Sequence, residues 1–174
     1  MPTPRFNFVS SQDIANGNCS YSEQDLMLIY EVKLVRSESE TTSLVDSIDN
    51  KFNITPRQDL LVTADTLTLE FSGDSFCFKG LDAYTSKELW DESSSPVPDL
   101  SGSGVFAVDP NSLMNGSGDI DLELSYELSP SENWVRIKWP NETSANFFRV
   151  GTNMIIGLSR SLITDIYLLN VTFR

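Results

Sequence analysis

The feature that most constrains this chain is a strict alternation over residues 120–128, which read Ile-Asp-Leu-Glu-Leu-Ser-Tyr-Glu-Leu. Every even position is apolar and every odd position is polar. Successive side chains of an extended chain point to opposite sides, so this pattern is typical of a β-strand with one buried face. Residues 134–139 alternate again after the turn-forming run Ser-Pro-Ser-Glu-Asn. The sequence therefore predicts an antiparallel hairpin.

The buried faces of the two strands also fix how they pair. A shift of one residue would turn the acidic side chains of the first strand into the core, so the apolar set decides the register. The register also places Glu127 opposite Arg136, a favourable but small interaction. Three pairs are expected on the buried face: Leu128 with Val135, Tyr126 with Ile137, and Leu124 with Trp139.

The rest of the chain repeats this character. A second hairpin is expected over residues 66–79, and longer strands over 26–34 and 166–173. Shorter strands are expected at 6–10, 52–55, 60–63, 105–108 and 147–150, whereas 154–162 fits a helix or a strand and 85–91 fits a turn of helix. Long polar loops separate them at 37–42, 92–104 and 110–118.

Short strands that do not alternate with helices indicate an all-β protein. We expect it to form a single β-sandwich or jelly-roll-like domain. We predict an N-terminal arm over residues 1–20 and the β-sandwich domain over residues 21–174. Extended terminal arms are part of this expectation.

Composition narrows the function classes. The chain has 174 residues, with 12 Lys and Arg against 25 Asp and Glu, no His, and a net charge of −13. This charge disfavours a direct grip on nucleic acid. Because the chain has no histidine, it cannot form a Ser-His-Asp triad or a Cys-His dyad. Two cysteines without histidine cannot supply the usual zinc ligands. No Gly-rich phosphate loop is present. We therefore expect neither enzyme activity nor a cofactor.

Two weaker signals leave alternatives open. Hard oxygen donors gather around one loop, where they fit either calcium or ordinary solvated turns, and the spacing does not match a helix-loop-helix calcium site. Cys19 and Cys77 could form one bridge, but two free thiols are the simpler interpretation. The oxygen donors are Asp109, Asn111, Asn115, Asp119 and Asp121.

No secretory signal is expected at the amino end, and no apolar run is long enough for a spanning helix. Trp134 is expected to point with Arg136 and Lys138, away from Val135. An exposed tryptophan there could anchor an interface or stack on a sugar. The alternative is that a loop, the second sheet or a neighbouring subunit covers it, and Trp90 has the same ambiguity.

Two classes of function remain. The first is a structural subunit of a large assembly, whose terminal segments add to the sheet edges of its own copies or of other shell or tail proteins. Its expected interface residues are Phe6, Phe8, Trp134, Arg136, Lys138, Val171 and Phe173. The second is a carbohydrate-binding module that stacks sugars on Trp134, Trp90, Tyr84 or Tyr126. Neither class requires a membrane.

In size, acidity, alternation such as that of residues 120–128, and polar loops, the chain resembles small β-rich virion proteins of tailed phages. The resemblance covers the whole chain loosely. It implies a place in the virion, most simply as a capsid cement (decoration) protein that bridges neighbouring capsid subunits. The alternative within the family is a tail-tube subunit, whose acidic residues near Asp119 and Glu123 would line a channel for DNA.

Overall fold

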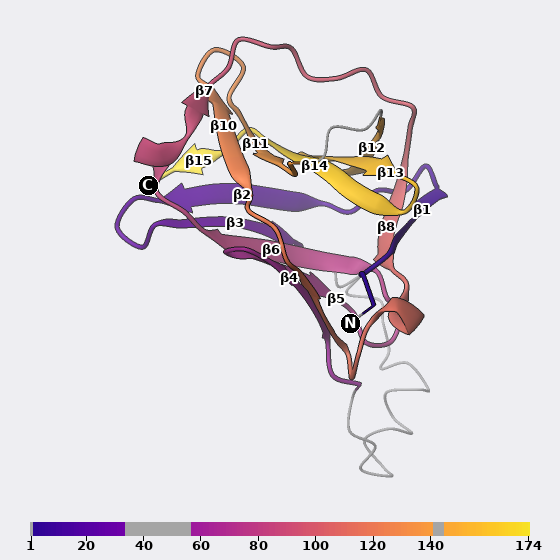
Figure 1. The fold of residues 1–174 in the computed structure, drawn as a ribbon. Coiled ribbons are helices and arrows are strands. Elements are labelled where there is room, and N and C mark those ends of the chain that lie inside the picture. Colours follow the sequence, from indigo (N-terminus) through magenta and orange to yellow (C-terminus); the bar gives the residue numbers. More distant parts are fainter. Residues whose placement is uncertain (1, 34–56, 141–144) are drawn as a thin grey trace, which may run out of the picture.

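The computed structural model describes residues 2–33, 57–140 and 145–174 and consists of two β-sheets packed face to face (Figure 1). The prediction of an all-β sandwich is confirmed. The eight-stranded sheet has the order β1 (Phe6–Ser10), β8 (Gly102–Val108), β12 (Asn146–Gly151), β13 (Met154–Ser159), β14 (Leu162–Leu169), β11 (Trp134–Lys138), β10 (Ser125–Ser129) and β7 (Asp91–Glu92). The seven-stranded sheet has the order β15 (Thr172–Phe173), β2 (Gly17–Ser22), β3 (Met27–Val32), β6 (Phe78–Tyr84), β5 (Leu67–Phe71), β4 (Leu60–Ala64) and β9 (Ser117–Ile120).

The predicted hairpin is present as β10 and β11, with the predicted register. Tyr126 pairs with Ile137 and Leu128 with Val135, while Glu127 lies opposite Arg136. The Arg136 guanidinium donates to the Glu127 carboxylate at 3.0 Å. Burial of the apolar face and the cross-strand ion pair thus favour the same register.

The strand predicted over residues 120–128 is wrong in one respect, because it is not continuous. β9 ends at Ile120 in one sheet and β10 begins at Ser125 in the other. Leu124 lies between them, and its N–H donates to the Asp65 carboxylate at 3.2 Å. Both sheets share one interior, so the chain keeps its apolar side chains inward while it crosses from sheet to sheet. Alternation alone does not reveal such a crossing.

The same difference occurs near the carboxyl end. The single strand predicted over 166–173 is divided into β14 and β15, which belong to different sheets. Asn170, at the break, has a φ of 54°. This left-handed conformation is one that Asn tolerates, and it turns the chain out of β14. Val171 then packs into the shared core with 3% of its surface exposed.

The other expected elements can be compared briefly. The hairpin at 66–79 is present as β5 and β6, although a bulge shifts its register. Residues 154–162 form strand, as β13 and its turn into β14, and 85–91 contain the 3-10 helix η1 (Lys87–Leu89). A second, η2, covers Pro110–Ser112. The segments 37–42 and 52–55 lie outside the described residues. In the described part of the chain no helix could cross a membrane.

The division into an arm over residues 1–20 and a sandwich over 21–174 does not match the strands. β1 is a member of the eight-stranded sheet, and the proposed boundary at residue 20 falls inside β2. Phe6 is 1% exposed, with its ring centroid 5.5 Å from that of Phe106 and 5.9 Å from that of Phe71. The free energy gained by burying this ring holds the beginning of the chain in the sandwich.

Candidate assembly surfaces

The expected interface residue Trp134 lies on the outer face of the eight-stranded sheet but is covered. As predicted, it points away from Val135, yet only 1% of its surface is exposed. It packs with Ile155 and Tyr167, and Val97 lies against this cluster. Val97 belongs to the chain between β7 and β8, which runs along the outside of this sheet (Figure 1). Of the two alternatives for Trp134, the exposed one is therefore wrong. A loop of the chain itself covers this side chain.

Arg136, on the same face, is held by two carboxylates. Its Nη2 lies 2.6 Å from Oδ1 of Asp165, which is 5% exposed, and its Nη1 lies 3.0 Å from Glu127. Its guanidinium carbon lies 5.4 Å from the ring centroid of Tyr167. Burial is the largest single influence and lowers the pKa of Arg136, but the hydrogen bonds and charges of its neighbours, led by Asp165, together raise it more, so its net shift is upward. Arg136 is thus part of an intramolecular ion-pair network.

The remaining expected interface residues divide between core and surface. Val171 and Phe6 are buried in the main core, so neither offers a contact to a partner. Phe8 is half-buried and stacks on Phe148 with ring centroids 3.9 Å apart. Lys138 is half-buried at the end of β11. Phe173 alone combines an exposed ring with a place at a sheet edge.

The backbone of β15 (Thr172–Phe173) is open on one side. Arg174 N–H donates to Tyr21 O at 2.9 Å, and Glu23 N–H donates to Arg174 O at 3.1 Å, so Arg174 faces β2. Backbone groups alternate in direction along a strand, hence the N–H and C=O of Phe173 point away from β2. Phe173 is 37% exposed, and the Lys87 ammonium lies 4.7 Å from its ring centroid.

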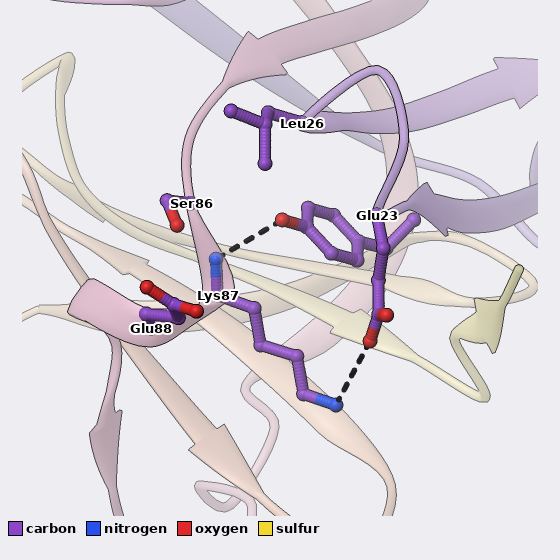
Figure 2. A pocket seen from close by; sticks show the side chains of 6 residues that line it. Glu23, Leu26, Ser86, Lys87 and Glu88 are labelled. Carbon is purple, nitrogen blue, oxygen red and sulfur yellow. Dashed lines mark hydrogen bonds and ion pairs between the residues drawn. The ribbon is translucent and has the colours of Figure 1, made fainter.

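A hollow of about 390 Å³ lies beside this edge, lined by Tyr21, Glu23, Leu26, Ser86, Lys87 and Glu88. The Tyr21 hydroxyl donates to Thr85 O at 3.0 Å and accepts from Lys87 N–H at 3.0 Å, which fixes η1 above β2. The Lys87 ammonium is 3.7 Å from a Glu23 oxygen. Glu23 and Glu88 flank Lys87 on opposite sides in Figure 2. The lining thus holds two carboxylates and one ammonium together with the Tyr21 ring and the Leu26 side chain.

The edge strand β7 (Asp91–Glu92) of the other sheet lies on the same side of the sandwich as β15 (Figure 1). Ser93 N–H donates to Leu128 O at 2.9 Å, so the backbone of Glu92 points outward by the same alternation. Trp90 fills the space between the two edges: its ring centroid is 4.8 Å from that of Tyr21 and 6.1 Å from that of Tyr126. The sequence did not suggest this arrangement, because η1 brings together residues far apart along the chain.

The aromatic side chains proposed for sugar binding are mostly unavailable. Trp134, Trp90 and Tyr126 are buried, and of the four only Tyr84 is exposed, at 57%. Burial raises the pKa of Tyr126, as expected for a phenol in the core. Of the four side chains proposed for sugar binding, one thus remains available for stacking.

The loop carboxylates have structural partners. Asp109 accepts from the N–H of Asn111 and so caps η2, and Asp119 accepts from the Thr63 hydroxyl. Within residues 2–33, 57–140 and 145–174, no three acidic or cysteine side chains gather in a way that could hold a metal ion. Cys19 and Cys77 are free thiols. Burial raises the pKa of Cys19 to about 12, so this thiol is protonated at neutral pH.

Comparison with known proteins does not assign the chain to a class. No protein-family model matches it, and no curated protein matches it. Arguments about function therefore rest on the geometry of the chain itself.

Proposed function

We propose that this protein is a structural subunit of a larger protein assembly, joined to its neighbours through a sheet edge. The observation that carries the proposal is the edge at β15 and β7, where outward-pointing backbone groups coincide with exposed apolar side chains. Phe173 is 37% exposed and Leu89, in η1, is 81% exposed. Backbone pairing across an open edge gives contact along a whole strand, and repetition around a symmetric assembly multiplies it.

Within this class we propose a capsid cement protein of the virion that bridges neighbouring capsid subunits, as the resemblance to small β-rich phage proteins implies. A sandwich with a net charge of −13 suits an outer position, away from packaged DNA. The alternative is a tail-tube subunit. It would use acidic residues such as Asp119 and the exposed Glu123 to repel DNA from a channel wall. The two differ in assembly, since a tube subunit closes into rings of its own copies and a cement protein requires a shell.

A carbohydrate-binding module is the second candidate, and Tyr84 is what supports it. This ring is 57% exposed at the end of β6, on the outer face of the seven-stranded sheet. One aromatic ring supports at most weak stacking. Loss of glycan binding in Tyr84→Ala would favour the module, and absence of any glycan binding would count against it.

The test of the assembly proposal is light scattering of the purified protein, alone and mixed with candidate shell or tail proteins. Self-association into rings would support the tube, and binding only to a preformed shell would support the cement role. A matched pair of variants, Phe173→Ser at the edge and Met114→Ser at a site 51% exposed elsewhere, separates edge contacts from general loss of apolar surface. A strict monomer that binds none of these partners would refute the proposal.

A further inference from the structure

The edge formed by β15, η1 and β7, with the hollow beside it, has the features of a site for an extended peptide. We call it the β15–β7 edge. A strand that adds to a sheet needs free backbone groups on the edge and space for alternate side chains. Phe173 supplies the backbone groups, and the hollow of about 390 Å³ supplies the space. Lys87 links the two, because its ammonium lies over the Phe173 ring and its side chain lines the hollow.

The charges at this edge favour one kind of occupant. Glu23 and Glu88 both line the hollow, but its single cation, Lys87, is 3.7 Å from Glu23. In the ranges that the structure describes, no cation forms an ion pair with Glu88. The edge strand β7 adds two exposed carboxylates, Asp91 and Glu92. A ligand with a cationic head would therefore supply Glu88 with a partner for an ion pair.

The mixed lining of the hollow selects the shape of that ligand. The Tyr21 ring and the Leu26 side chain are apolar, whereas the carboxylates flank Lys87 (Figure 2). Lysine and arginine combine an apolar stem with a charged head, so they match a lining that has both apolar and acidic side chains. An acidic or purely apolar side chain would match only one part of it.

We propose that the β15–β7 edge binds an extended segment of a partner protein, which pairs with the backbone of Phe173 and places a lysine or arginine side chain in the hollow. The inference rests on the proposed function, since it names the surface and the chemistry of the partner. A second copy of this acidic chain fits less well than a basic segment of another protein, because like charges would face each other.

The test is an NMR titration of the ¹⁵N-labelled full chain with a blocked peptide of alternating valine and arginine. We expect the amide signals of Phe173, Lys87 and Glu92 to shift. Two control peptides, one alternating valine with glutamate and one with N-methyl groups on its pairing edge, should leave these signals unchanged. Shifts spread over the acidic surface, or equal binding of the N-methylated peptide, would overturn the proposal.

Charge variants sharpen the test. Glu88→Gln should lower the affinity for the valine–arginine peptide about two- to fivefold, the range for one exposed ion pair. Glu88→Lys should weaken it further. Asp74→Asn removes the same charge from the exposed β5–β6 turn and should leave the affinity unchanged. Equal effects of Glu88→Gln and Asp74→Asn would show that only net charge matters and would refute the site.

The two proposals fail in different ways. If light scattering shows assembly while the peptide leaves the β15–β7 edge unaffected, this inference is wrong and the structural role remains. If the peptide binds at the edge but no shell or tail protein associates with the chain, the structural role is wrong and the edge remains a peptide site.

Discussion

Tyr30 provides the most demanding test of the packing between the sheets. Its ring is fully buried and extends from β3 to the backbone of Gly17 in β2 and of Gly151 in β12. A Cβ added at Gly151 would overlap the Tyr30 hydroxyl oxygen but would lie 3.2 Å from ring carbon Cζ. A Cβ added at Gly17 would overlap both the hydroxyl and the ring, with Cε1 at 2.7 Å. The hydroxyl is thus the main obstacle at Gly151 but not at Gly17.

The cost of these substitutions follows from how little the site can move. The Tyr30 ring stacks on Phe78 at 6.0 Å, and beside Gly151 the N–H of Thr152 donates to Ala15 O at 2.9 Å. Overpacking a rigid core costs about 1–3 kcal/mol, so we expect Gly151→Ala and Gly17→Ala each to lower the free energy of unfolding by about 3 kcal/mol. Tyr30→Phe alone should stay within about 1 kcal/mol of the wild type.

The double variants then separate the two glycines. Tyr30→Phe with Gly151→Ala should recover about 2 kcal/mol, because only a contact at 3.2 Å remains. Tyr30→Phe with Gly17→Ala should recover little, since the ring carbons still overlap. The assay is urea unfolding followed by tryptophan fluorescence, in which 3 kcal/mol moves the midpoint by about 1.5 M. Equal rescue at both glycines, or an unchanged midpoint for Gly151→Ala, would refute the reasoning.

Three further predictions concern pH, an ion pair and a strand edge. Burial raises the pKa of Cys19 from 9.0 to about 12 and that of Tyr30 from 10.0 to about 12. Both groups are neutral in the folded protein, so the stability that they contribute is complete below pH 9. It is lost as the pH rises from the unfolded pKa values through about 12. Urea midpoints should fall between pH 8 and 11, and less so in Tyr30→Phe. Asp165→Asn should lower the free energy of unfolding by about 2 kcal/mol and Glu127→Gln by less than about 1 kcal/mol, because Asp165 is the more buried of the two carboxylates that bind Arg136. Thermal unfolding of both variants measures this difference, and equal losses would contradict it. Gly104→Ala should release β1 to proteolysis at a concentration that leaves the wild type intact, because its Cβ would overlap the backbone of β1; unchanged cleavage would contradict this.

Side-chain alternation predicted much of the fold, since it depends only on which face of a strand is buried. It placed Glu127 opposite Arg136 and set Trp134 on the face opposite Val135, and both are confirmed. It could not show that the chain changes sheets between Ile120 and Ser125, because the side chains face one interior on either side of the crossing.

The candidate site was less accessible to prediction. Phe173 was among the expected interface residues, but its neighbours Glu23 and Lys87 were not, because the contacts among them join the β2–β3 turn, η1 and β15. The cover over Trp134 likewise depends on Val97, in a loop without periodicity. Contacts of this kind arise from tertiary packing, and no local pattern in the sequence encodes them.

Two of the crossings between sheets, at residues 121–124 and 170–171, are short and have a mechanical consequence. A sandwich whose layers are joined only at its ends can shear, one layer sliding over the other. Here the polypeptide passes through the seam at both places, so sideways force on one layer is transmitted covalently to the other. Under such a force the two sheets should move together rather than slide past each other.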